Sequence, residues 1–235
     1  MKAGIIAAGL GERFRGAGIS TPKPLLVVGG RTLLERTIHS ASDAGAQTVA
    51  LIVNAETPEV ERYVREHSWP VPVELTVKTT PSSMESFFAL EPHLNDAPFL
   101  LTTVDTVMAE GTLAGLAKAG LAAGPIGTLA LTSFVDDEKP LWARLGSHGG
   151  EILALGRAAA GSGWVTSGAY FFFPAVYDRV AEARRRRLGA LREFLALLLE
   201  DGCRLHGFAA GDSIDIDRPQ DVAAAEKFLE SRERS

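Results

Sequence analysis

The chain has 235 residues, a formal net charge of −5 and hydrophobic residues at 46% of its positions, a composition typical of a globular domain and not of a disordered chain. Its single cysteine, Cys203, excludes an internal disulfide and a zinc site built from several cysteines. The acidic balance argues against a nucleic-acid partner, and no apolar run approaches the roughly 18 residues that a membrane span needs.

The first predicted element is a strand over Lys2–Ala7, an apolar run that leads into a glycine-rich turn. The apolar start also resembles a signal peptide, but the run stops at Gly11 and no small-residue cleavage site follows. We therefore interpret it as a buried strand and expect a cytoplasmic protein without a membrane partner.

From this strand to Gly124, strands alternate with helices of about ten residues. The further strands are predicted over Val49–Val53, Val73–Val77 and Phe99–Val104. The helices are predicted over Thr32–Ala44, Pro58–His67, Ser83–His93 and Thr112–Ala122. This alternation predicts an α/β protein with a Rossmann-like, mostly parallel mixed sheet and helices on both faces.

After Gly124 the pattern changes to strands with few helices between them. The strands are predicted over Ile126–Phe134, Leu141–Leu145, Glu151–Leu155, Trp164–Phe173 and Arg204–Phe208, with a turn at His148-Gly149-Gly150. The helices are predicted over Ala175–Arg186, Leu188–Glu200 and Pro219–Leu229. Because no linker separates the two halves, we expect one domain over residues 1–235.

Two segments near the start carry features of a phosphate site. In the glycine-rich turn, Ala7–Arg13, small residues directly after a buried strand let backbone N–H groups approach a phosphate. Phe14 stands where a dinucleotide fingerprint has its third glycine, which disfavours a Rossmann dehydrogenase. Lys23 lies between two prolines, whose restrained backbone makes its ammonium a well-placed point charge for a phosphate. Taken singly, each segment is equally compatible with a structural turn.

Aspartates from two distant parts of the sequence are candidates for the same site as the glycine-rich turn. Asp105 ends the strand Phe99–Val104, and ligands of open α/β sheets bind beyond the carboxyl ends of the strands. A role for Asp105 as a helix N-cap is equally open. Near the end of the chain, alternation places Asp215 and Asp217 on one side of an extended segment. Asp217 precedes a helix that Pro219 helps to start, so capping is its expected role.

Together these segments resemble the signature of the sugar-1-phosphate nucleotidyltransferases, which have the nucleotide-diphospho-sugar transferase fold. The resemblance is carried by Ala7–Arg13, by Pro22-Lys23-Pro24-Leu25, by Val104-Asp105, and by Asp215-Ile216-Asp217-Arg218-Pro219-Gln220-Asp221. It implies a nucleotide-binding half over residues 1–124 and an acceptor-binding half over residues 125–235. It also implies that Arg13 and Lys23 are catalytic and that Asp105 and Asp215, in preference to Asp217, hold a Mg2+ cofactor.

The same resemblance assigns the residues of the two substrate sites. The nucleotide-binding residues that it implies are Ala7, Ala8, Gly9, Gly11, Arg13, Lys23 and Ser83. Ser82 and Ser83 are also candidates for the N-cap of the helix that follows. The segment Val165–Phe171 resembles the strand beside the sugar, which makes Thr166 and Gly168 the predicted acceptor-binding residues, with an ordinary buried strand as the alternative.

Three departures from the family pattern limit the prediction. Glu138-Lys139-Pro140 resembles the segment that touches the sugar phosphate, but it precedes the predicted hairpin, and Arg157 stands near the place expected for the lysine. The acceptor-binding cation is therefore left open. Glu12 replaces a small residue of the turn and is unfavourable beside a triphosphate unless it points away or meets the metal. The loop Thr79–Ser86 differs from the base-reading patterns, so the base is not predicted.

The expected function is magnesium-dependent transfer of a nucleoside monophosphate from an NTP to a sugar 1-phosphate, which gives an NDP-sugar and pyrophosphate. The alternatives are a cytidylyltransferase-type enzyme that acts on a phosphorylated alcohol, and a nucleotide-sensing module of the same fold without turnover. The expected partners are the NTP and a phosphorylated small-molecule acceptor, and assembly into a homo-oligomer is left open. The arginine run Arg184–Arg187 is expected to complement a helix end and not to bind nucleic acid.

Overall fold

A single seven-stranded sheet forms the centre of the protein in the computed structural model, which describes residues 1–124, 126–133, 140–147 and 150–233. Its strand order is β12-β8-β11-β6-β1-β4-β5. The strands are β1 (Lys2–Ala7), β4 (Val49–Val53), β5 (Val73–Val77), β6 (Phe99–Thr103), β8 (Gly127–Thr132), β11 (Val165–Phe172) and β12 (Leu205–Ala209). The strand β11 runs antiparallel to β6 and β8, and the other neighbouring strands are parallel. The predicted mostly parallel mixed sheet is confirmed.

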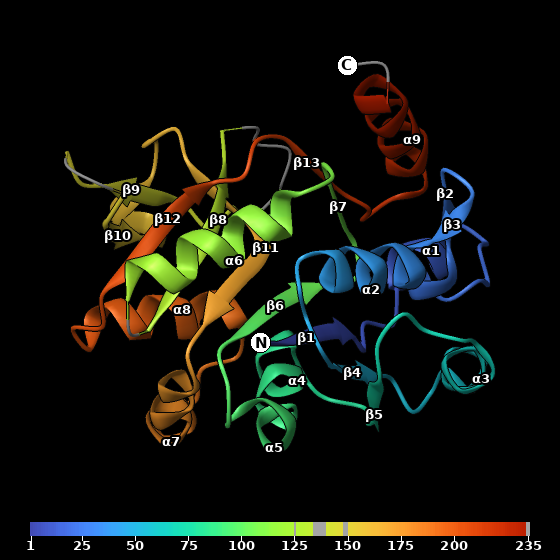
Figure 1. Ribbon diagram of the computed structural model, residues 1–235, viewed down its shortest axis with the longest axis horizontal. Helices are drawn as coiled ribbons and strands as arrows, with labels where there is room; N and C mark the ends of the chain where they lie inside the picture. Colours follow the sequence, from blue (N-terminus) through green and yellow to red (C-terminus); the bar gives the residue numbers. More distant parts are fainter. Residues whose placement is uncertain (125, 134–139, 148–149, 234–235) are drawn as a thin grey trace.

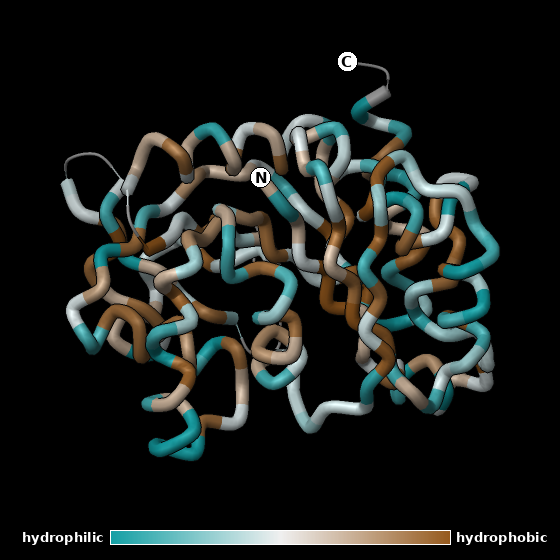
Figure 2. The backbone as a smooth tube through the Cα atoms, turned by 60° about the horizontal axis from the view of Figure 1, so that its bottom comes forward, coloured by the Kyte–Doolittle hydropathy of each residue, from teal (hydrophilic) through white to brown (hydrophobic). Residues whose placement is uncertain are grey.

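Helices cover both faces of this sheet (Figure 1). One layer contains α2 (Leu33–Asp43), α3 (Pro58–Glu66) and α6 (Thr112–Ala123). The opposite layer contains α4 (Ser83–Ala89), α5 (Glu91–Leu94), α7 (Val180–Arg185) and α8 (Leu191–Glu200). Successive strand residues alternate between the layers, so that Ile5 packs on the first and Ile6 on the second. Figure 2 shows the apolar stretches that run through the interior between these layers.

Shorter elements join and extend this framework. They are α1 (Glu12–Gly16), η1 (Lys23–Leu25), β2 (Val27–Val28), β3 (Arg31–Thr32), β7 (Thr106–Met108), β9 (Ala143–Leu145), β10 (Ile152–Leu155), η2 (Gly156–Ala159), η3 (Pro174–Arg179), β13 (Ser213–Asp215) and α9 (Pro219–Glu233). Strand β13 pairs with β7, which brings the segment before the C-terminal helix beside the end of β6. No helix in the described part of the chain is long and apolar enough to cross a membrane.

The prediction of one continuous helix over Ser83–His93 is wrong, because the structure has two helices there, α4 and α5, which are separated at Leu90. Pro92 is the cause, since its ring clashes with the carbonyl four residues earlier and it has no N–H to donate. Proline is tolerated in the first turn of a helix, and α5 therefore begins at Glu91.

Two predicted helix bounds in the second half also change. The first five residues of the helix expected over Ala175–Arg186 belong to the 3-10 helix η3, which begins at Pro174, and α7 follows it. The helix expected from Leu188 begins only at Leu191, because the Glu193 carboxylate accepts hydrogen bonds from the N–H groups of Gly189 and Ala190 outside the helix. The predicted features at Phe134, Glu138-Lys139 and His148-Gly149 lie outside the described residues.

Candidate active site

Chain segments from both halves of the sequence meet at one edge of the sheet. Strands β1, β4 and β6 are parallel, so the glycine-rich turn, Asn54 and Asp105, which follow them, lie at the same edge. Strand β11 runs the other way, and its beginning therefore lies there too. Two cavities open at this edge, with volumes of about 420 Å³ and 250 Å³. Both are bounded by Ser83, Thr103 and Asp105, so they are neighbours.

The larger cavity, called the nucleotide cavity below, is bounded by most of the residues predicted to bind nucleotide. Those residues are Ala7, Ala8, Gly9, Lys23 and Ser83. Gly11 is not among the described lining residues, and it precedes α1 with a φ of 63°, a left-handed conformation that favours glycine. Glu12 is exposed and belongs to the lining, so an acidic side chain does border this cavity.

Lys23 is held inside the nucleotide cavity by two carboxylates. Its Nζ lies 2.7 Å from Asp105 Oδ2 and 3.0 Å from Asp217 Oδ1, and its side chain is only 11% exposed. Burial alone would lower the pKa of Lys23, but the charges and hydrogen bonds of the two aspartates outweigh burial and raise that pKa. The ammonium is therefore positively charged at neutral pH and fixed in position.

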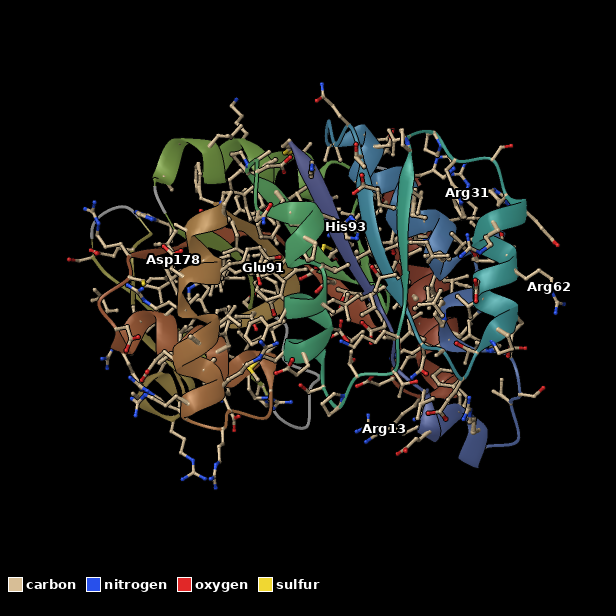
Figure 3. All side chains as sticks on the ribbon, turned by 90° about the horizontal axis from the view of Figure 1, so that it is seen from below. Arg13, Arg31, Arg62, Glu91, His93 and Asp178 are labelled. Atoms are coloured by element: carbon tan, nitrogen blue, oxygen red, sulfur yellow. The ribbon has the colours of Figure 1, made fainter. Side chains whose placement is uncertain are left out.

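Asp217 joins the two predicted catalytic cations to each other. One carboxylate oxygen contacts Lys23, and the other accepts a hydrogen bond of 3.1 Å from Arg13 Nη1. Figure 3 shows Arg13 on α1 at the outer edge of the molecule. The capping role predicted for Asp217 is wrong, because the side chain of Asp221 accepts from the N–H groups of Asp217 and Arg218 at the start of α9. The carboxylate of Asp217 faces the two cations instead.

The pairing of β7 with β13 brings Asp105 and Asp215 together. The N–H of Ile216 donates to the carbonyl of Asp105 over 2.9 Å, and Thr106 Oγ1 donates to Asp215 Oδ1 over 2.6 Å. Burial alone would raise the pKa of Asp105, but the charge and hydrogen bond of Lys23 lower it. Asp105 is therefore ionised at neutral pH, which is the form that a cation ligand must have.

The donor set at this point fits magnesium, the predicted cofactor. Magnesium commonly takes one or two carboxylates together with phosphate oxygens and water. Asp105, which lines both cavities, and Asp215, which lines the smaller one, supply two carboxylates. Within the described ranges, no group of three or more His, Cys, Asp or Glu side chains is arranged to hold a metal ion by itself.

Asn54 is a site residue that the sequence analysis missed. It is 2% exposed, and its Nδ2 donates to the carbonyl of Ala8 in the glycine-rich turn over 2.9 Å. Its Oδ1 accepts from Thr79 Oγ1 over 2.8 Å, which ties the turn to the loop that borders the other side of the cavity. A polar residue directly after the all-apolar strand β4 was the available signal. Ser82, at the start of α4, acts as its N-cap as expected.

The smaller cavity, called the acceptor cavity below, contains both predicted acceptor-binding residues. Thr166 and Gly168 line it together with Asp105, Asp215 and Asp217, with Tyr170, and with Ala190, Leu191 and Arg192 at the start of α8. Burial raises the pKa of Tyr170 to about 12, so its hydroxyl is neutral at physiological pH. Arg157, one of the two cations considered for the acceptor, lies on η2 and is not among the described lining residues.

Gly168 has a structural reason to be glycine. Its φ is 72°, and a Cβ there would lie 2.5 Å from Thr106 Oγ1 and 3.1 Å from Thr103 Oγ1. Gly168→Ala is expected to lower the free energy of unfolding by about 2 kcal/mol or more, through backbone strain and this clash. Gly18→Ala is the matched control, because Gly18 has a φ of 81° with open space around it, and about 1 kcal/mol is expected there. Urea unfolding of both variants tests the difference, and equal losses would contradict the clash.

Comparisons with known proteins show the family and the fold of the chain. The model of the family described as "MobA-like NTP transferase domain" matches residues 3–169, well over half of the chain. A mannose-1-phosphate guanyltransferase from Neurospora crassa is 26% identical over 230 residues, which cover 94% of this chain and 62% of that protein. The chain thus spans less than two thirds of the length of this relative.

Solved structures show the same fold at low sequence identity. The inositol-1-phosphate CTP transferase from T. maritima has a TM-score of 0.77 at 19% identity, with 97% of both chains covered. A UDP-glucose pyrophosphorylase complexed with UDP-glucose has a TM-score of 0.80 at 15% identity, with 97% of this chain and 98% of that chain covered. The nucleotide-diphospho-sugar transferase type of fold predicted from the sequence is confirmed.

Proposed function

Because the chain belongs to the family of MobA-like NTP transferase domains, we propose that it transfers a nucleoside monophosphate from an NTP to a sugar 1-phosphate and releases pyrophosphate. The observation that carries this proposal is the pair of neighbouring cavities that share Asp105. One is bounded by the glycine-rich turn and Lys23, and the other by Thr166 and Gly168. Such a pair provides room for a triphosphate and a second substrate with their reacting groups together.

In the proposed reaction, an oxygen of the acceptor phosphate attacks the α-phosphorus of the NTP. The new P–O bond forms as the bond from the α-phosphorus to the bridging oxygen breaks, and that oxygen leaves with pyrophosphate. Lys23 and Arg13 stabilise the negative charge on the transferring and leaving phosphates. The chain forms no covalent intermediate, and its contribution is positioning and charge neutralisation.

Asp105 and Asp215 are the residues that would hold the magnesium ion. When bound, magnesium neutralises phosphate charge and orients the phosphate groups for in-line transfer. Asn54 fixes the glycine-rich turn through the carbonyl of Ala8, so the backbone that faces the phosphates is held in place before the substrate arrives. Gly168 allows β11 to approach Thr103 and Thr106, which keeps the acceptor cavity next to Asp105.

The two C-terminal aspartates are expected to differ in function. Asp215→Asn should lower magnesium-dependent kcat by about 100-fold through loss of a metal-binding carboxylate. Asp217→Asn should lower kcat by about 10-fold. This substitution removes the carboxylate that Lys23 and Arg13 share, but Lys23 remains paired with Asp105. Turnover measured against magnesium concentration separates the two, since only Asp215→Asn should need more magnesium. A larger loss at Asp217 would transfer the metal role to that residue.

The proposed function is tested by pyrophosphate release in the presence of magnesium. ATP, CTP, GTP, TTP and UTP are each offered with mannose 1-phosphate, glucose 1-phosphate, other sugar 1-phosphates, and inositol 1-phosphate as a phosphorylated alcohol. We expect release that requires one NTP together with a sugar 1-phosphate. Release of pyrophosphate with inositol 1-phosphate as the acceptor, and with none of the sugar 1-phosphates, would favour the cytidylyltransferase-type alternative. NTP binding by calorimetry without release from any pair would favour the nucleotide-sensing module.

A further inference from the structure

Two threonine hydroxyls lie between the two carboxylates that are proposed to hold magnesium. Thr103 is the last residue of β6 and Thr106 the first of β7, so they stand on either side of Asp105 in the chain. Their Oγ1 atoms are 3.2 Å apart, and both residues line the acceptor cavity together with Asp105 and Asp215. The two hydroxyls are therefore in a position to act on both carboxylates.

Each of these hydroxyls has one of the carboxylates as its partner. Thr106 Oγ1 donates to Asp215 Oδ1 over 2.6 Å. The hydroxyl of Thr103 is a partner of the Asp105 side chain. Since an ionised carboxylate only accepts hydrogen bonds, Thr103 is the donor in this second contact. The contacts thus run from Asp105 through Thr103 and Thr106 to Asp215, and a bridge of two hydroxyls joins the two carboxylates.

The packing of β11 fixes the place of both hydroxyls. A Cβ at Gly168 would lie 2.5 Å from Thr106 Oγ1 and 3.1 Å from Thr103 Oγ1, so the hydroxyls occupy the space that a side chain there would take. Threonine is also stiff about its first side-chain torsion, because its Cβ is branched. The backbone of Thr106 pairs with that of Asp215 in the β7–β13 ladder. The donors are therefore held in position before any cation arrives.

A neutral donor suits a carboxylate that must also bind a cation. Asp105 and Asp215 repel each other when no cation lies between them, and this repulsion favours orientations that move them apart. Hydrogen bonds from outside the metal site oppose such movement, and their loss commonly costs 10- to 100-fold in metal affinity. The ammonium of Lys23 also holds Asp105, but its charge repels a metal ion. A hydroxyl orients the carboxylate without this repulsion.

We propose that Thr103 and Thr106 are positioning residues, which orient Asp105 and Asp215 toward one divalent cation. This inference rests on the proposed function and adds to it the residues through which the two carboxylates are coupled. The hydroxyls act on the carboxylates and not on the substrates. Removal of either hydroxyl should therefore weaken metal binding even when neither the NTP nor the acceptor is present.

The test measures the binding of Mn2+, used as the probe, to the protein without nucleotide, by the electron paramagnetic resonance signal of the free ion. Valine has nearly the shape of threonine but no hydroxyl. In Thr106→Val the Kd for Mn2+ is expected to rise about 10-fold. Thr103→Val should raise it less, because Lys23 still holds Asp105. Thr106→Ser keeps the hydroxyl and should recover most of the affinity.

Thr128→Val is the matched control. Thr128 is a buried strand threonine on β8, 1% exposed, and its Oγ1 has no hydrogen-bond partner among the described residues. It is not among the described lining residues of either cavity. The same substitution there should leave the Kd for Mn2+ unchanged and should not lower the Tm, since no hydrogen bond is lost.

An unchanged Kd for Mn2+ in both Thr106→Val and Thr103→Val would overturn the inference. So would a loss that Thr106→Ser does not recover, because the packing of the side chain and not its hydroxyl would then be responsible. An unchanged protein that binds no Mn2+ would overturn it as well. Thermal unfolding of each variant shows whether it folds. Failure of the proposed function looks different, since it removes pyrophosphate release from the unchanged protein and leaves the Mn2+ comparison intact.

Discussion

Lys23→Ala is expected to lower kcat by about 100- to 1,000-fold, which is the usual effect of removing one preorganised charge from a phosphate-transfer site. The ammonium of Lys23 is buried in the nucleotide cavity and raised in pKa, so it is fully charged where the phosphates would lie. Two hydrogen bonds hold the ammonium in position, so it does not have to be reoriented when the substrate binds. Its loss should therefore affect the transition state more than the binding of NTP.

The measurement is steady-state pyrophosphate release for Lys23→Ala and for the control Lys118→Ala. Lys118 is an exposed lysine on α6 that lines neither cavity, and its removal should leave kcat unchanged. Lys23→Ala leaves Asp105 and Asp217 without their shared cation, so thermal unfolding must accompany the kinetics. A folded Lys23→Ala protein with near-normal kcat would contradict the catalytic role.

Asp105→Asn is expected to reduce magnesium-dependent turnover by about 1,000-fold or more, because it removes a metal-binding carboxylate and the nearest partner of Lys23 at once. Asparagine has nearly the same shape, and the bond between the Ile216 N–H and the carbonyl of residue 105 involves the backbone only. The fold and the β7–β13 pairing should therefore survive. The predicted loss is chemical and not structural.

Turnover against magnesium concentration, together with thermal unfolding, checks this expectation. Asp178→Asn is a matched control, since Asp178, which is labelled in Figure 3, is exposed on η3. It is not among the described lining residues of either cavity. Excess magnesium should not restore Asp105→Asn, because this variant also lacks the carboxylate that holds Lys23 in position. Activity of the unchanged protein in EDTA equal to that in magnesium would contradict the metal assignment for both aspartates.

The sheet and its helices could be predicted because their signals are local. Alternating or continuous apolar runs predicted the strands β1, β4, β5, β6 and β11 within a residue or two of the observed bounds. Where a local rule was overlooked, the prediction failed, as at Pro92, which divides the helix predicted over Ser83–His93. The short strands β7 and β13 carry too few residues for any periodicity, and their pairing is what brings Asp215 to Asp105.

By itself, the sequence determined the fold class, the glycine-rich turn and the family resemblance, because these depend on residues adjacent in the chain. Only the tertiary structure decided which distant side chains share one space. It placed Asp217 between Arg13 and Lys23, buried Asn54 against the glycine-rich turn, and brought Arg192 to the acceptor cavity. The physical reason is that charge pairing and burial depend on distances in the folded chain, and no local periodicity encodes contacts between residues some 200 positions apart.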